Sequence, residues 1–283
     1  MPERDAHLVG SLPGATPAEA MRTALEILGP RLASLPADMD SHPAFLEARA
    51  AAGRADLMFQ HSVPSDLTRA VAGLGLTGAL RSRRRFTEAT LNEIRDVSAT
   101  AGPDTLFQIE VPTEVALIAK LPPQIRPAMA NVLARPTVGL ATRSAPGTRF
   151  AVHLCLGEMN DRAFGTLSDV NPLVLLSNAI VAGWPAGQPL DLVHAPFAAA
   201  DQPTTTDPAF YGPLSNLRVP PGTRFSAGFA HVSRSVGDQR TVRGIIEDHL
   251  GSEVVVSAGC GLGRRTPEDA RALLERMAEL CEF

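Results

Sequence analysis

Short apolar runs alternate with amphipathic helical segments along most of the chain. Eight of the runs have the length and apolar content of buried strands, and they span residues 7–11, 31–36, 56–61, 105–111, 149–155, 189–194, 224–231 and 253–260. Strands that alternate with helices are typical of a parallel sheet, and eight such units are typical of a closed barrel. The pattern therefore predicts an α/β fold, a single (β/α)₈ TIM barrel that occupies residues 1–283.

Three of the intervening segments carry signals for helix ends. The segments TPAE at 16–19 and TPED at 266–269 each combine an N-cap threonine, a proline in the first turn and an acidic residue. The segment NPLVLLSNAIVAG at 171–183 opens on Asn-Pro and closes on glycine, which favours a buried helix over a strand. With a helix there, the sixth strand is 189–194.

One long segment lacks a periodic pattern. Residues 196–223 are polar and rich in proline, and a long irregular excursion in a compact domain is usually functional. We predict a loop over the mouth of the barrel.

Composition and charge exclude some classes of partner. The chain has 45% hydrophobic and 20% charged residues, which is typical of a globular protein with a large core. The chain has 26 Lys and Arg residues and 30 Asp and Glu residues, which gives a net charge of −4. This charge predicts no binding of nucleic acid or of an anionic membrane. The basic segment RSRRRF at 81–86 is interpreted as a solvated loop or helix start, with anion binding as the alternative.

The chain also lacks targeting patterns. Its first residues show no signal-peptide pattern, and no apolar run reaches the length of about 18 residues that a membrane-spanning helix needs. Three cysteines are too few for a disulfide framework and fit a reducing compartment. We therefore expect a cytoplasmic protein.

Candidate chemistry lies at the carboxyl ends of the predicted strands, where barrels build their active sites. The polar residues there are Ser11, Asp38, Asp40, His61, Glu110, His153, Cys155, His194, His231 and Cys260. Residues two apart on a strand share a face, so His153 and Cys155 in VHLCLG should converge. Together with Cys260, this pair predicts a metal site. Taken singly, a histidine or cysteine at such a place is more often an ordinary core residue than a metal ligand.

Four motifs give the chain a family resemblance. They are HLVGSLP at 7–13, FQIEVP at 107–112, HLCLGEMND at 153–161 and SAGCGLGRR at 257–265. On these motifs the chain resembles the catalytic barrel of cobalamin-independent methionine synthase, within the superfamily shared with uroporphyrinogen decarboxylase. It is closer to short relatives that share FYGPLSNL and CGLGRR than to the synthase itself.

The resemblance implies a zinc site. His153, Cys155 and Cys260 match the family's zinc ligands, and the family takes its fourth ligand, a glutamate, from the end of the sixth strand. If 189–194 is that strand, the equivalent residue is His194, and a site of two histidines and two cysteines is ordinary for zinc. Glu158 is the competing fourth ligand, and His231 is the third choice.

The resemblance also implies substrate contacts. Ser11 and Glu110 lie where the family contacts the amino-acid portion of its thiol substrate, and Asp40 and His231 are further candidates. Where the family has an aspartate followed by a glutamate before the proline, this chain has Glu110 followed by Val111, so the recognised amine can differ from homocysteine.

By this resemblance, the expected function is that of a zinc-dependent methyl- or alkyltransferase that activates a small thiol acceptor as a zinc thiolate. The donor is expected to be a methylfolate or a methylcorrinoid, and RSRRRF is a candidate for contact with an anionic tail of the donor. Two alternatives stay open: a zinc-dependent lyase, hydrolase or decarboxylase-like enzyme, and a barrel that binds a small molecule without turnover.

Overall fold

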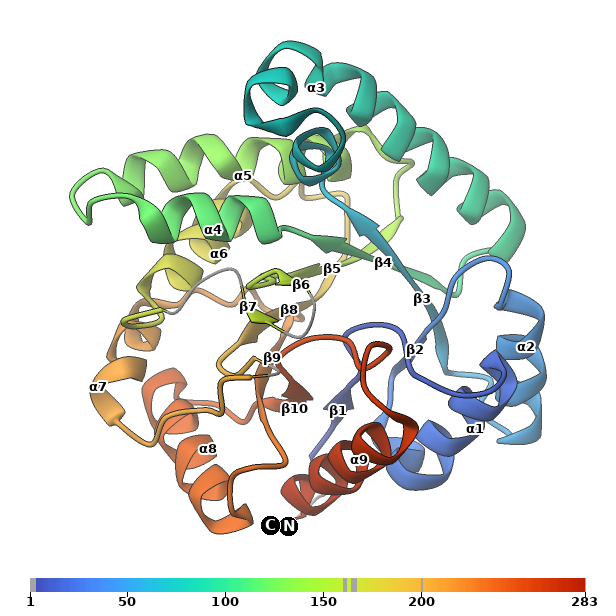
Figure 1. Ribbon diagram of the computed structural model, residues 1–283. Coiled ribbons are helices and arrows are strands. Elements are labelled where there is room, and N and C mark those ends of the chain that lie inside the picture. The colour runs from blue at the N-terminus through green and yellow to red at the C-terminus, as the bar shows by residue number, and fades with distance from the viewer. Residues whose placement is uncertain (1–3, 160–161, 164–166, 200, 283) are drawn as a thin grey trace.

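The predicted barrel is confirmed in a computed structural model of the chain, which describes residues 4–159, 162–163, 167–199 and 201–282 (Figure 1). One parallel sheet contains β1 (Ala6–His7), β2 (Ser34–Pro36), β3 (Met58–Pro64), β4 (Thr105–Glu110), β5 (Arg149–His153), β8 (Leu190–Pro196), β9 (Arg224–Ala230) and β10 (Val255–Ala258). The order β1-β10-β9-β8-β5-β4-β3-β2 brings the first strand beside the last. A parallel bridge between Ala6 and Leu32 joins the two remaining edges.

The helices form a ring outside the strands, as Figure 1 shows. They are α1 (Pro17–Leu28), α2 (His42–Ala51), α3 (Asp66–Ala101), α4 (Pro112–Lys120), α5 (Arg126–Arg143), α6 (Asn171–Gly183), α7 (Pro208–Tyr211), α8 (Val236–Leu250) and α9 (Pro267–Cys281). Two 3₁₀ turns, η1 (Gly29–Arg31) and η2 (Gly212–Asn216), and a hairpin of β6 (Glu158–Met159) and β7 (Arg162–Ala163) complete the described elements.

The predicted helix caps are confirmed. The Thr16 hydroxyl accepts a hydrogen bond from the Glu19 amide at 3.2 Å, and the Glu19 carboxylate accepts one from the Ala15 amide at 3.0 Å. At the other end of the chain, the Thr266 hydroxyl caps α9 by accepting from the Asp269 amide at 3.1 Å. These bonds satisfy amide groups that no helical carbonyl can reach, and so they set where α1 and α9 begin.

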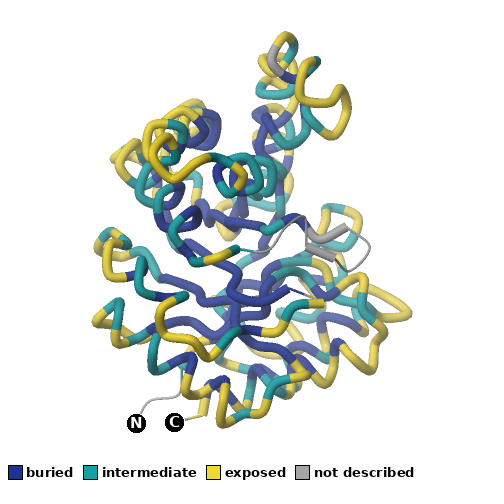
Figure 2. Tube along the Cα trace, turned by 60° about the vertical axis from the view of Figure 1, so that its left-hand side comes forward, coloured by how far each residue is buried: buried dark blue, intermediate teal, exposed yellow. Residues whose placement is uncertain are grey.

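Buried apolar side chains form one large cluster and a small second cluster of Leu106, Ala151 and Leu192. Figure 2 shows that most strand residues are buried. The segment 171–183 is confirmed as a buried helix, since Leu173, Leu176 and Ile180 are each at most 1% exposed. No helix in the described part of the chain is long and apolar enough to cross a membrane.

The arginine-rich segment 81–86 lies inside α3, and the prediction of a loop or helix start was wrong. Ser65 caps α3 well before this segment, and the helical axis breaks at Gly75, where φ is 66°. Glycine takes this left-handed conformation at little cost, so the chain turns there and continues as helix through the arginines. Arg81 and Arg84 are exposed.

The segment 196–223 is more regular than predicted, because it contains α7 and η2. Tyr211 and Leu214 in these turns are buried, and the Asn178 side chain of α6 donates to the Asn216 carbonyl at 2.8 Å. Residues 208–216 pack against α6 and α8 as part of the helical layer. The prediction of a loop over the mouth was therefore wrong for residues 208–216, since scattered apolar residues within the polar sequence anchor them to the outer layer.

Candidate metal centre

Strand β5 directs His153 and Cys155 toward the same side. His153 is the last residue of the strand, and Cys155 follows two positions later with 7% of its surface exposed. The Leu154 amide between them donates to the His194 carbonyl at 2.9 Å, which extends the pairing with β8 past the end of β5. The chain turns tightly at this point, because the Cys155 amide donates to the His153 carbonyl at 2.9 Å, and the thiol lies in one group with the imidazole.

Cys260 comes from the loop after β10, and glycine holds this loop in place. A Cβ on Gly259 would lie 2.0 Å from the carbonyl oxygen of Ala198, so no larger residue fits there without moving backbone. This close approach packs the loop after β10 against the segment after β8. It fixes the position from which Cys260 reaches the end of β5.

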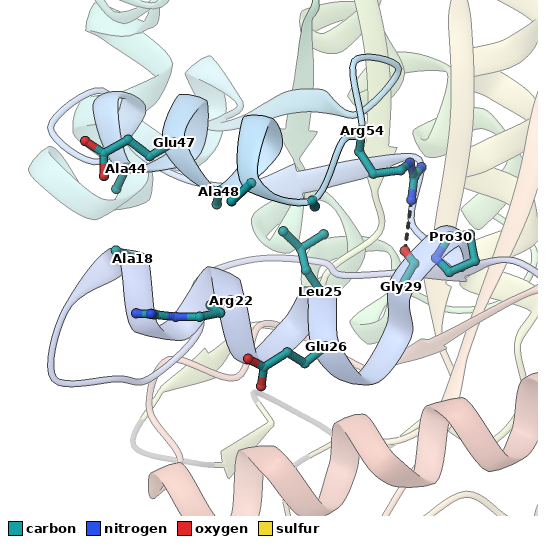
Figure 3. Close-up of a pocket in the computed structure, with 12 residues that line it drawn as sticks. Ala18, Arg22, Leu25, Glu26, Gly29, Pro30, Ala44, Glu47, Ala48 and Arg54 are labelled. Atoms are coloured by element: carbon teal, nitrogen blue, oxygen red, sulfur yellow. Dashed lines mark hydrogen bonds between the residues drawn. The ribbon is translucent and has the colours of Figure 1, made fainter.

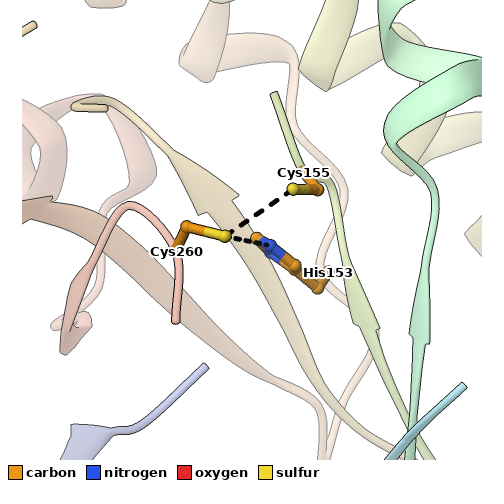
Figure 4. A group of neighbouring side chains, drawn as sticks. All are labelled: His153, Cys155 and Cys260. Atoms are coloured by element: carbon orange, nitrogen blue, oxygen red, sulfur yellow. Dashed lines mark hydrogen bonds between the residues drawn. The ribbon is translucent and has the colours of Figure 1, made fainter. Parts of the chain in front are cut away.

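The three side chains form a compact group (Figure 4). The two sulfur atoms of Cys155 and Cys260 lie 3.8 Å apart, and the Cys260 sulfur lies 3.8 Å from Nε2 of His153. Two sulfurs bound tetrahedrally to zinc at about 2.3 Å would lie about 3.8 Å apart. The donor set and its spacing therefore fit a zinc ion, and the group could hold one.

The pKa values of the two cysteines are shifted in opposite directions. The hydrogen bond from the Cys155 thiol holds the pKa of Cys260 well below its usual value, and the contact with His153 adds to this. Donating that hydrogen bond raises the pKa of Cys155, and burial raises it further. One sulfur of the pair is thus stabilised as a thiolate, the form in which cysteine binds metals.

His194 lies behind this group. Its Nδ1 is 2.7 Å from Nδ1 of His153, and its Nε2 is 3.0 Å from the carbonyl oxygen of Ala258. Burial lowers the pKa of His194 well below its usual value, and the neighbouring His153 and His7 lower it further. Both ring nitrogens are thus occupied in hydrogen bonds, and the structure does not bring His194 into the three-residue group.

A layer of buried amide side chains, which the sequence pattern did not predict, lies deeper in the barrel. The Gln60 amide donates to the Gln108 side-chain oxygen at 3.1 Å, and His7 Nε2 lies 3.2 Å from the same oxygen. A period of two could have found these residues, because Gln60 lies two before Ser62 and Gln108 two before Glu110. Side chains at that spacing point into the barrel together.

A cavity of about 480 Å³ opens beside the metal group. Its lining includes Ser11, Asp38, His61, Glu110, Cys155, Cys260 and Arg264. The structure thus brings two of the predicted substrate-binding residues, Ser11 and Glu110, to the same space as the two cysteines. Burial raises the pKa of the Glu110 carboxyl group, and the nearby Cys260 raises it further, while His153 opposes both.

The other predicted site residues lie elsewhere. Asp40 is exposed and does not line the cavity, whereas Asp38, two residues earlier, does. His231 is buried at the end of β9, where its Nδ1 lies 2.8 Å from the Ser233 hydroxyl, and it does not line the cavity. The Glu158 side chain lies outside the described part of the structure.

His61 is linked by polar contacts to Glu93 and, through it, to Arg69. Its Nε2 lies 3.2 Å from the Glu93 carboxylate, which also pairs with Arg69. The hydrogen bond to His61 lowers the pKa of Glu93, so the carboxylate stays ionised behind the imidazole. This pairing orients the His61 ring at the edge of the cavity.

A larger cavity of about 640 Å³ lies on the outside of the barrel between α1 and α2 (Figure 3). Alanines and Leu25 line much of it, and Arg54 at one end donates to the Gly29 carbonyl at 3.0 Å. Its lining holds no cysteine or histidine, so it offers no ligand set comparable to the group at the barrel mouth.

Comparison with known proteins gives the fold and no family. Neither a protein-family model nor a curated protein sequence matches the chain. A B12-independent methionine synthase from Shewanella sp. W3-18-1 has a similar structure, with a TM-score of 0.53 and 12% identity over 88% of this chain and 67% of that chain. A putative vitamin B12-independent methionine synthase from Listeria monocytogenes has a TM-score of 0.48 at 12% identity, over 87% of this chain and 69% of its own. PbGH5A, a glycoside hydrolase family 5 enzyme from Prevotella bryantii B14, has a TM-score of 0.47 at 15% identity, over 96% and 87%. The first of these similarities shows a shared barrel fold.

Proposed function

We propose that this barrel is a zinc-dependent methyl- or alkyltransferase whose acceptor is a small thiol. The observation that carries the proposal is the group of His153, Cys155 and Cys260 beside the cavity at the barrel mouth. Structural zinc sites usually have four protein ligands, whereas catalytic sites have three and leave one position open. Three ligands from the described residues, with the cysteines lining a cavity, fit the second kind.

The chemistry of the donor set favours a thiol as the acceptor. Zinc held by thiolates supplies the Lewis acidity that keeps an added thiol deprotonated near neutral pH. The chain's own residues then hold the acceptor, with Cys155 and Cys260 at one side of the cavity and Glu110 and Ser11 at another. Fixing the nucleophile in this way lowers the entropic part of the barrier to in-line attack on an alkyl donor.

The proposed alkyl donor has to reach the cavity from outside the barrel. A methylfolate or a methylcorrinoid fits the resemblance, and either would have to enter through the mouth that exposes the cavity. The arginine-rich segment 81–86 does not line this cavity, so contact with an anionic tail would require a donor that extends beyond it.

Metal analysis of purified variants tests the ligand assignment. We expect about one zinc per chain in the wild type and loss of zinc in His153→Ala, Cys155→Ala and Cys260→Ala, because each change removes one of three ligands. Cys281→Ala is the matched control, since this buried cysteine lies at the end of α9 and outside the group. Full zinc occupancy in all three ligand variants would rule the site out.

One observation favours a second candidate, a zinc-dependent lyase or hydrolase. Glu110 lines the same cavity, and its raised pKa suits proton transfer to or from a substrate. Activity measured with methyl donors plus thiols, against activity with ester or amide substrates, separates the two candidates. Chelator-sensitive turnover of the second set alone would replace the transferase proposal.

A further inference from the structure

We infer that His194 is a positioning residue for the metal site, which holds His153 in the tautomer that leaves Nε2 open to the metal. This inference rests on the zinc site of the proposed function and goes beyond it. It assigns His194 to a hydrogen-bonded support behind the ligands, in place of the fourth-ligand role expected from the family resemblance.

The carbonyl oxygen of Ala258 determines which nitrogens of His194 and His153 carry hydrogens. Ala258 offers only an acceptor, so Nε2 of His194, 3.0 Å away, must carry a hydrogen and donate it. In a neutral imidazole the other nitrogen, Nδ1, then has the lone pair. Nδ1 of His153 lies 2.7 Å from Nδ1 of His194, so Nδ1 of His153 is the donor of this second hydrogen bond.

This hydrogen bond determines what Nε2 of His153 can offer to a metal. With its hydrogen on Nδ1, the neutral ring has a lone pair on Nε2, the nitrogen that lies 3.8 Å from the Cys260 sulfur. That lone pair is what a metal ligand must offer. The opposite tautomer would present an N–H to the cysteines and could bind metal only after a proton shift.

The fold reserves space for His194 in this orientation. A Cβ on Gly228 of β9 would lie 2.7 Å from Nε2 of His194 and 2.8 Å from the Ala258 carbonyl oxygen. Any side chain at Gly228 would therefore enter the hydrogen bond itself. His194 is 0% exposed and its ring centroid lies 4.7 Å from that of His153, so neighbouring strands hold both rings in place.

The first test uses the unmodified protein. Long-range ¹H–¹⁵N NMR of the zinc-loaded protein with labelled histidine should show His153 with its hydrogen on Nδ1 and none on Nε2. X-ray absorption of the zinc-loaded protein should show one imidazole and two sulfurs around the metal. Two imidazoles, or a His153 hydrogen on Nε2, would overturn the inference, whereas absence of bound zinc would instead defeat the proposed function.

Variants measure how much the support contributes. His194→Leu removes the acceptor for His153 and should weaken zinc binding about 10- to 100-fold in a chelator competition, the usual effect of losing such a partner. His194→Gln should restore most of this affinity, because its amide can accept from His153 and donate to Ala258. Equal losses in both variants would contradict the relay.

A matched control separates this role from general damage to the barrel. His7 is also buried, its ring centroid lies 5.9 Å from that of His194, and it bonds Gln108. His7→Leu should leave zinc affinity unchanged. If it weakens binding as much as His194→Leu does, loss of packing explains both effects and the positioning role is wrong.

Discussion

At the scale of single residues, Glu110 connects the cavity to the choice of acceptor. Its carboxyl group lines the same space as Cys155 and Cys260, and burial raises its pKa. A bound ammonium group would favour the ionised form, because an opposite charge at short range offsets the cost of burial. Glu110 is therefore suited to an acceptor that carries an amine at one end and a thiol at the other.

We expect Glu110→Gln to weaken the binding of cysteamine, a thiol that carries an amine, about 10- to 100-fold. A hydrogen bond to a charged group is worth about 1.5–3 kcal/mol. Binding can be followed by the visible absorption of the cobalt-substituted protein. The neutral thiol 2-mercaptoethanol is the matched probe and should lose little affinity. Equal losses for both thiols would exclude Glu110 from amine recognition.

At the scale of elements, a buried carboxyl group joins α3 to α4. Glu114 in the first turn of α4 is 0% exposed and accepts from the Ser65 hydroxyl at 2.6 Å and the Thr68 hydroxyl at 3.3 Å. Burial raises its pKa to about 7, the hydrogen bonds oppose the rise, and nearby Asp66 adds to it. The folded protein therefore binds a proton here across a pH range where the unfolded chain does not.

This pKa predicts how stability depends on pH. A folded-state pKa of about 7 against 4.5 in the unfolded chain leaves stability unaffected below pH 4.5, and stability then falls as pH rises through 7. Glu114→Gln should remove that fall, so its advantage over the wild type should grow by roughly 2–3 kcal/mol between pH 5 and pH 8. Urea unfolding at both pH values measures it.

Comparing the two proteins at each pH cancels the titration of the metal site, which they share. Glu268→Gln, on the exposed first turn of α9, is the control for loss of a carboxyl group and should run parallel to the wild type. If Glu114→Gln also runs parallel, the buried carboxyl group does not titrate as proposed.

Both the helices and strands and the group of metal ligands could be predicted from the sequence. Apolar runs and helix caps are local signals, and a barrel brings strand ends together, so the proximity of Cys260 to His153 follows from the fold. The orientation of His194 depends on space beside Gly228 and on a carbonyl from another strand, which no local pattern records. Loop residues are likewise underdetermined, as Asp38 in place of Asp40 at the cavity shows.

At the scale of the whole molecule, the metal site ties distant parts of the chain together. Cys155 and Cys260 are 105 positions apart, and they follow two strands, β5 and β10, that are not neighbours in the sheet. The barrel has its own hydrophobic core on both sides of the sheet, so folding should not depend on the metal as it does in a zinc finger. Metal binding should add to a stability that already exists.

The size of this addition follows from mass action. Zinc that binds only the folded state at 100 times its dissociation constant stabilises the protein by about 2.7 kcal/mol, which corresponds to about 4–5 °C in Tm for a chain of this size. Calorimetry with buffered zinc and with a chelator should show this shift, while circular dichroism stays unchanged. Cys260→Ser should abolish the shift and Cys281→Ser should keep it, since Cys281 lies outside the ligand group. A wild-type Tm that ignores zinc would mean that the three side chains pack beside one another without binding a metal.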